Sequence, residues 1–134
     1  DIIWAEGGDD SISTGAGNDI IYGGAGNDTI RAGSGDDVVY GDAGDDYLEA
    51  GNGTDTLYGG TGNDIFVGGE GINYMYGEDG DDTFYGGNGL NYMYGGNGDD
   101  NFTGGELADY GRCFEQLERT IDKMLERLMR EHCI

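Results

Sequence analysis

Several residue types are scarce in this chain, and each shortage removes a class of protein. Of the 134 residues none is proline, one is histidine, two are cysteine and six are lysine or arginine. The only histidine, His132, and the cysteines Cys113 and Cys133 fit no zinc-binding pattern. Neither the HExxH motif of zinc proteases nor the GxSxG motif of lipases occurs, so we expect no enzyme. No apolar run is long enough to span a bilayer.

The six basic residues are opposed by 28 acidic ones, and the imbalance is local. Residues 1–104 contain 21 acidic residues and Arg31 as their single base, which gives a net charge of −20. Because no basic stripe is present, this composition excludes nucleic acid as a partner. A segment with so much charge of one sign is expected to stay unfolded until cations neutralise it.

Glycine, in contrast, is abundant, with 30 residues. Most of the glycines belong to a nine-residue repeat, small-Gly-x-Gly-x-Asp-x-apolar-x. This repeat occurs eleven times without an insertion from Ala5 to Thr103. The fourth position is always glycine, the eighth is always apolar, and the sixth is aspartate in nine copies. These aspartates are Asp10, Asp19, Asp28, Asp37, Asp46, Asp55, Asp64, Asp82 and Asp100.

This unit resembles the RTX, or haemolysin-type, calcium-binding repeat of secreted bacterial proteins, and the resemblance covers roughly residues 1–105. It implies an all-β fold, the parallel β-roll, which is a two-sheet right-handed solenoid. It also implies that calcium ions lie between stacked loops, held by the nine aspartates and by loop carbonyls. The expected carbonyls lie near Gly15, Gly17, Gly24, Gly26, Gly33, Gly35, Gly51, Gly53, Gly60 and Gly62. Proteins of this family are secreted by type I systems, and many are toxins or exoenzymes.

The chemistry of one repeat agrees with this expectation. Glycine permits left-handed backbone angles and close approach of chains, so the first six residues form a tight loop. Three residues such as 29–31 then form a short strand whose middle side chain points inward. Two loops and two strands make one coil of 18 residues, and alternate loops stack on the same edge. Stacked loops offer carboxylate and carbonyl oxygens, the donors that calcium prefers.

The number of calcium ions follows from the number of stacked loops. Eleven loops leave at most nine gaps, five on one edge and four on the other. In two loops Asn73 and Asn91 replace the aspartate, and Ile72 and Leu90 replace the preceding polar residue. We expect the two gaps that these loops border to bind weakly or not at all, which leaves about seven Ca²⁺.

The ninth-position residues of one predicted sheet form an aromatic column about 24 Å long at the usual strand spacing. Its members are Trp4, Tyr22, Tyr40, Tyr58, Tyr76 and Tyr94. Two interpretations remain open: an exposed apolar strip of this size often meets a partner, and stacked rings also stabilise the sheet that carries them.

Residues 106–134 form a second segment and resemble no family. An amphipathic helix of about twenty residues is expected from about Arg112 to Glu131. Its apolar face includes Phe114, Leu117, Ile121, Met124 and Leu128. We consider three roles for it: a cap over the aromatic strip or the open solenoid end, a homodimer contact, and a secretion signal. In a continuous helix Cys113 and Cys133 are too far apart to bond, which leaves free thiols or a crosslink between two chains.

Together these features predict a calcium-binding module that follows a larger parent chain upstream. It is expected to be disordered without calcium and to fold on binding several Ca²⁺ ions after secretion, so that folding and binding are one event. The alternative is an adhesive or oligomerising module that uses the Trp/Tyr face and the C-terminal helix. A third hypothesis, ice binding, depends on the single loop Thr61-Gly62-Asn63-Asp64.

Overall fold

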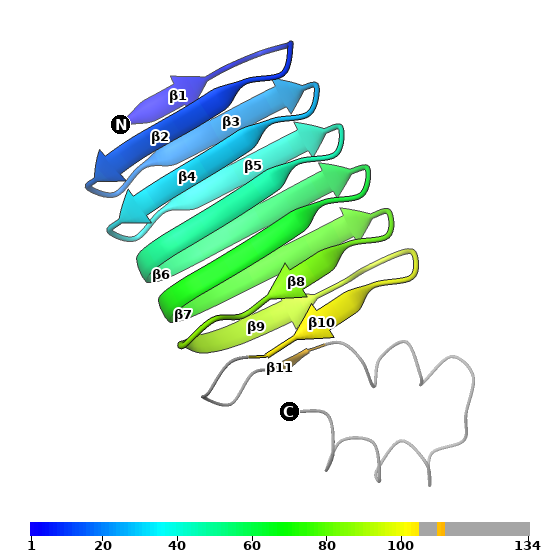
Figure 1. The fold of residues 1–134 in the computed structure, drawn as a ribbon. Coiled ribbons are helices and arrows are strands. Elements are labelled where there is room, and N and C mark those ends of the chain that lie inside the picture. The colour runs from blue at the N-terminus through cyan, green and yellow to red at the C-terminus, as the bar shows by residue number, and fades with distance from the viewer. Residues whose placement is uncertain (105–109, 112–134) are drawn as a thin grey trace, which may run out of the picture.

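The computed structural model describes residues 1–104 and 110–111, which form an all-β parallel solenoid of about six turns (Figure 1). The strands are β1 (Ile2–Trp4), β2 (Ser11–Ala16), β3 (Ile20–Ala25), β4 (Thr29–Ser34), β5 (Val38–Ala43), β6 (Tyr47–Thr61), β7 (Ile65–Asp79), β8 (Thr83–Tyr85), β9 (Leu90–Tyr94), β10 (Asn101–Thr103) and β11 (Tyr110–Gly111). The described residues contain no helix, so none there could span a membrane. The predicted all-β solenoid is confirmed for this part of the chain.

The coil length of 18 residues is visible in the strand register. In the parallel pairs Ile12 faces Ile30, and Ile30 faces Leu48, each eighteen residues further along the chain. A parallel ladder with this register places the same repeat position of successive coils in one column. The nine-residue sequence pattern is therefore converted into straight rows of like side chains.

The flattened solenoid has two faces joined by two edges. One face contains β2, β4, β8, β10 and the first parts of β6 and β7; the other contains β1, β3, β5, β9, β11 and the last parts of β6 and β7. We call the edge formed by loops 5–10, 23–28, 41–46, 59–64, 77–82 and 95–100 the first edge. The second edge is formed by loops 14–19, 32–37, 50–55, 68–73 and 86–91. Strands β6 and β7, of 15 residues each, cross the second edge without a break.

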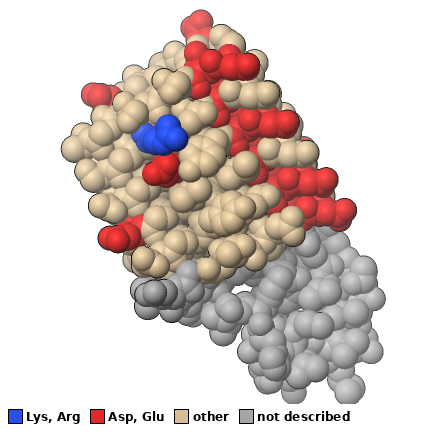
Figure 2. Space-filling view, viewed as in Figure 1, with Lys and Arg blue, Asp and Glu red and all other residues tan. Residues whose placement is uncertain are grey.

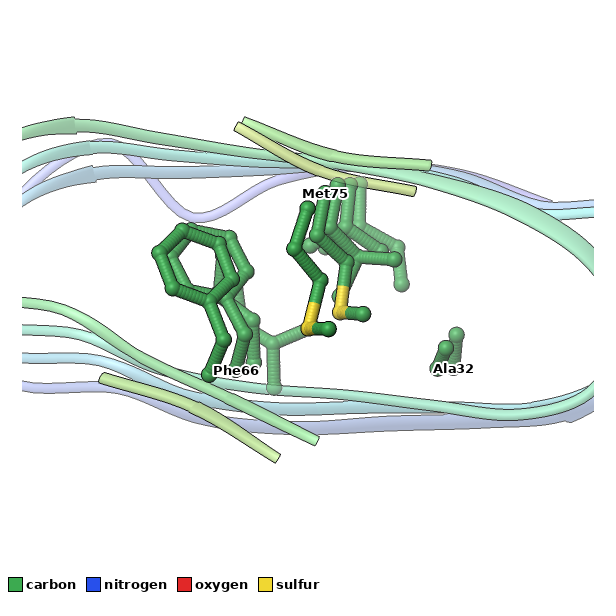
Figure 3. Close-up of a cluster of buried hydrophobic side chains, with 11 residues drawn as sticks. Ala32, Phe66 and Met75 are labelled. Atoms are coloured by element: carbon green, nitrogen blue, oxygen red, sulfur yellow. The ribbon is translucent and has the colours of Figure 1, made fainter. Parts of the chain in front are cut away.

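The eighth-position side chains fill the interior, as the repeat predicts. Figure 3 shows Phe66 and Met75 projecting toward each other from opposite faces, with Ala32 further along the flattened space. The fully buried residues of this core are Ile21, Ile30, Ala32, Val39, Leu48, Ala50, Leu57, Phe66, Met75 and Phe84. The ring centroids of Phe66 and Phe84 are 4.6 Å apart. Bulkier side chains toward the C-terminal coils enlarge the apolar surface that is removed from water there.

The predicted aromatic column is a continuous stack of rings. Successive centroids from Trp4 to Tyr94 are 3.9–5.0 Å apart, and neighbouring planes differ by 3–13°. Trp4, at the end of the stack, is 65% exposed, whereas the tyrosines are only partly exposed. Each tyrosine has its ring faces covered by its neighbours, so the solenoid presents ring edges along this column and not ring faces.

Acidic side chains dominate one margin of the molecule. Figure 2 shows them in separate clusters along the margin formed by the loops of the first edge. Exposed acidic residues of these loops are Glu6, Asp9, Asp42, Asp45, Glu78, Asp79, Asp81 and Asp99. The basic side chain of Arg31 lies on a face, where its Nε is 3.2 Å from Oε2 of Glu49. The guanidinium carbon of Arg31 is 5.6 Å from the centre of the Tyr47 ring.

Strand β11 pairs with β9, with Tyr110 opposite Tyr92, and so adds a rung to the sheet beyond residue 105, where we placed the end of the repeat domain. The predicted helix from about 112 to 131, its apolar residues and both cysteines lie outside the described residues.

Candidate metal site

The predicted metal-binding aspartates form two rows, one inside each edge. The first edge carries six of them, Asp10, Asp28, Asp46, Asp64, Asp82 and Asp100, one in every loop. The second edge carries Asp19, Asp37 and Asp55, followed by Asn73 and Asn91. The two sixth-position rows therefore differ in charge: the row of the first edge is acidic along its whole length, and the row of the second edge only along its N-terminal half.

In seven of the nine aspartates, from Asp28 onward, one carboxylate oxygen accepts a hydrogen bond from a backbone N–H of the preceding coil. The N–H of Asp28 donates to Oδ1 of Asp46 at 2.8 Å, and the N–H of Asp46 donates to Oδ1 of Asp64 at the same distance. The same hydrogen bond links Asp19 to Asp37 at 2.8 Å on the second edge. It fixes the orientation of each side chain, because a carboxylate held by a backbone N–H cannot rotate into solvent without breaking the bond.

In most of these carboxylates the other oxygen is buried and has no partner. This holds for Oδ2 of eight of the nine aspartates, namely Asp10, Asp19, Asp28, Asp37, Asp46, Asp55, Asp64 and Asp82. A buried carboxylate oxygen without a hydrogen bond is costly, and native proteins almost always satisfy such groups. Eight such oxygens at equivalent positions identify a repeated site for something that the protein chain does not supply.

A small space lies beside these oxygens on the first edge from Asp28 onward, because the first position of the repeat is glycine in each of those loops, whereas Ala5 precedes Asp10. A methyl group on Gly23 would be 2.7 Å from Oδ2 of Asp28 and 2.9 Å from the carbonyl oxygen of Gly41. A methyl group on Gly41 would meet Asp46 and the carbonyl of Gly59 in the same way. On the second edge the equivalent residues Ala32 and Ala50 carry a methyl group, so the two rows of carboxylates have different neighbours.

The glycines whose carbonyls were expected to contribute all have positive φ angles, between 90° for Gly15 and 132° for Gly53. At Gly26, for example, φ is 125° and a side chain would collide with the carbonyl oxygen of Gly8. Only glycine combines this conformation with such close stacking of the loops. The loops are thereby held at the spacing at which carbonyls of one coil approach carboxylates of the next.

The electrostatics of the rows favour cations. Burial raises the pKa of Asp64 to about 7 and the pKa values of Asp46 and Asp82 to about 6; neighbouring carboxylates act in the same direction, and the backbone hydrogen bond opposes them. Burial likewise raises the pKa of Asp55 to about 6. Two carboxylates about 5 Å apart repel by about 3 kcal/mol at an effective dielectric constant near 20. A divalent ion between them would convert this repulsion into attraction.

The donor set fits a hard cation. Among the described residues no three His, Cys, Asp or Glu side chains converge on one point, so soft-metal sites of the zinc type are not formed there. The arrangement instead combines one or two carboxylate oxygens with backbone carbonyls. Calcium takes six to eight such oxygens in flexible geometry. The first-edge carboxylates, together with carbonyls such as Gly41 and Gly59, would hold it.

A second row of contacts on the loops was not anticipated from the sequence. The fifth-position residue accepts a hydrogen bond from the following coil: the N–H of Asp45 donates to Oδ1 of Asn27, and the N–H of Asn63 donates to Oδ1 of Asp45. These bonds run in the opposite direction to those of the sixth position and lie in solvent. The frequency of Asp and Asn at the fifth position was the sequence feature that could have indicated this row.

A family model supports the assignment of the repeat. The model of the RTX calcium-binding nonapeptide repeat matches four times, at residues 1–30, 22–57, 58–93 and 76–110. No curated protein matches the chain. The matches cover most of the residues and coincide with the coils whose loops contain the unpartnered aspartate oxygens. The chain therefore belongs to the RTX calcium-binding nonapeptide repeat family.

Proposed function

We propose that this calcium-binding β-roll is a folding switch: it is disordered without calcium and folds when Ca²⁺ ions enter the gaps between stacked loops. The observation that carries the proposal is the row of buried Oδ2 atoms without a partner. Without a cation these oxygens are desolvated and repel one another, which opposes folding. With calcium they become ligands, so the free energy of binding is also free energy of folding.

Stoichiometry follows from the two rows. The first edge offers five gaps between its six aspartates, and the second edge offers two gaps, between Asp19 and Asp37 and between Asp37 and Asp55. We therefore propose about seven calcium ions, at most nine, each with oxygen ligands only. The role is structural and not catalytic. A secreted protein meets such ions outside the cell, so the switch suits a module that leaves the cell unfolded and folds outside, next to a parent toxin or exoenzyme.

A calcium titration tests this proposal. Circular dichroism from chelator to about 10 mM calcium, which spans the affinity range of extracellular modules, should show a steep gain of β-structure with little response to magnesium. Equilibrium dialysis at saturation should give about seven ions per chain. Complete β-structure in chelator, or fewer than three ions at saturation, would contradict the switch.

A second candidate function is adhesion or oligomerisation through the aromatic face. It is favoured by the exposure of Ile2 and Trp4, 66% and 65%, at one end of the ring stack. The molecular mass in solution, with and without calcium, separates the two functions: a calcium-dependent dimer or larger assembly favours adhesion, and a monomer at all concentrations speaks against it.

A further inference from the structure

In the C-terminal half of the second edge the buried sixth-position row has no carboxylates, and the acidic residue of these loops, Glu70, is exposed at a third position. Asn73 and Asn91 are fully buried there, and Nδ2 of Asn73 donates a 2.9 Å hydrogen bond to Oδ1 of Asn91. Oδ1 of Asn73 has no partner. Burying an unpaired neutral amide oxygen costs less free energy than burying an unpaired charged carboxylate oxygen. The row at this place is a neutral amide ladder, which does not repel itself.

The residues that precede the two asparagines also differ from those of the other loops, because they are apolar. Ile72 and Leu90 are opposite each other in the register of β7 and β9, where other loops carry Asp, Asn or Thr. An apolar pair at this position contributes contact energy in water alone, with no ion. Tyr74 and Tyr92 stack directly after it, with ring centroids 4.9 Å apart.

The backbone is also paired across this edge and not only along the faces. Strands β6 and β7 remain in register from Tyr47 opposite Ile65 to Thr61 opposite Asp79, through the whole second-edge loop. On the other side of β7 the pairing with β8 ends at Val67 opposite Tyr85, and pairing with β9 resumes at Ile72 opposite Leu90 and runs to Tyr76 opposite Tyr94. The earlier strands β2 to β5 have six residues each and end three residues into the following loop. The ladder between β7 and β9 therefore begins at Ile72 and Leu90, the point where this edge carries apolar and amide side chains.

We propose that Ile72, Asn73, Leu90 and Asn91 form a metal-independent clasp that keeps β7 and β9 paired when calcium is absent. This inference rests on the proposed function and restricts it: the coils on the N-terminal side of the clasp lose their structure in chelator, whereas the clasp keeps a local β-hydrogen-bonded core. The second edge thus combines two kinds of stacked loop, an N-terminal set closed by ions and a C-terminal set closed by neutral side chains.

Hydrogen exchange of the whole chain, measured by mass spectrometry in chelator and in calcium, tests the clasp. In chelator we expect amides of residues 72–76 and 90–94 to exchange at least about tenfold more slowly than those of residues 20–43. The double variant Asn73→Asp/Asn91→Asp should lose this difference in chelator, because it introduces two stacked carboxylates. In calcium it should be protected again and bind more ions than the wild type.

The matched control is Asn27→Asp/Asn63→Asp, which adds the same two charges at exposed fifth positions of the first edge. Its Oδ1 atoms can still accept the hydrogen bonds from Asp45 and Asp81, so the slow exchange of the clasp should persist. Equal, fast exchange throughout the chain in chelator overturns the clasp but leaves the switch intact if calcium restores protection. Slow exchange throughout in chelator overturns both. An Asn73→Asp/Asn91→Asp variant that exchanges like the wild type in chelator overturns the clasp alone.

Discussion

The N–H of Asp46 donates a 2.8 Å hydrogen bond to Oδ1 of Asp64, and Oδ2 of the same carboxylate is buried without a partner. The two oxygens of Asp64 therefore have separate roles. One aligns a coil with the coil before it, and the other is available to a cation. Substitutions can separate these roles, because asparagine keeps an acceptor oxygen but loses the charge.

Asp64→Asn is expected to change stability in opposite directions with and without calcium. In calcium the variant lacks a charged ligand, so affinity at the gaps beside Asp64 should fall by at least about tenfold, since ligand charge sets the affinity of such sites. In chelator it should form β-structure slightly more readily, because a buried charge and its repulsion are gone. Calorimetric titration and circular dichroism measure the two effects.

The control is Asp45→Asn, which removes the same charge from an exposed neighbour that hydrogen-bonds Asn63. It should leave calcium affinity within about twofold of wild type, because exposed charges are screened. Equal losses in the two variants would mean that total charge, and not the buried oxygen, sets the affinity.

Gly41→Ala tests the space beside the carboxylate. The added methyl group would lie 2.6 Å from Oδ2 of Asp46 and 2.8 Å from the carbonyl oxygen of Gly59. Overpacking of this kind costs about 1–3 kcal/mol. The midpoint of thermal unfolding in saturating calcium should drop accordingly.

Gly7→Ala is the matched control, because its methyl group would meet only the Ala25 carbonyl oxygen, at 3.7 Å. Its unfolding midpoint should stay near that of the wild type. A Gly41→Ala protein with an unchanged midpoint and unchanged calcium affinity would show that the space is not part of the site.

Acid should partly replace calcium. The pKa of Asp64 in the metal-free roll is about 7 and that of Asp46 about 6, both above the ordinary value of 3.8. Groups whose pKa is raised by folding favour the folded state most below their unfolded pKa, and this contribution is lost as pH rises through the folded pKa. In chelator, β-structure should therefore increase as pH falls from 7.5 to about 5.

The same protonation should weaken calcium binding over this pH range, because protons compete for the carboxylates. Calcium titrations at pH 7.5 and at about pH 5.5 measure this effect. A calcium affinity that is the same at both values would contradict the assignment of the buried aspartates as ligands.

Tyr58→Ser tests whether the aromatic column stabilises the roll. Tyr58 stacks on Tyr40 and on Tyr76 at centroid distances of 5.0 Å. Losing two aromatic pairs should cost about 1–3 kcal/mol, visible as a lower unfolding midpoint in calcium. Tyr85→Ser, on the other face and 47% exposed in the wild type, should cost less. If Tyr58→Ser instead abolishes an oligomer without lowering the midpoint, the column is an interface.

The sequence predicted the fold of residues 1–104 closely because the repeat has no insertion. With a fixed period of nine, the apolar position that contains Ile30 and Leu48 can only form one buried column, and the register follows. The positions of Asp28 and Asp46 inside the loops followed from the same period. The expected binding of calcium by these residues stays a prediction.

Other features depend on three-dimensional neighbours and could not be read from the period. The hydrogen bond from Asp45 to Asn27 joins residues whose side chains look interchangeable in sequence. The left-handed conformations of Asp42 and Glu78, with φ of 73° and 74°, occur at a position where alternate coils carry glycine. A pattern of residue types does not reveal which oxygen of a carboxylate is bonded and which has no partner.

The 18-residue coil contains two nine-residue repeats, so successive repeats place their loops on alternate edges of the solenoid. Deleting a single repeat, for example residues 41–49, would move every later loop to the opposite edge. Asn73 and Asn91 would then lie on the same edge as Asp10 and Asp28, separated from them by the loop of Asp55, and the acidic row would be divided between the edges. Only insertions or deletions of 18 residues, or multiples of 18, keep the two edges distinct. A family of engineered rolls built from this chain can therefore be lengthened by whole coils, about 4.8 Å at a time, but not by single repeats.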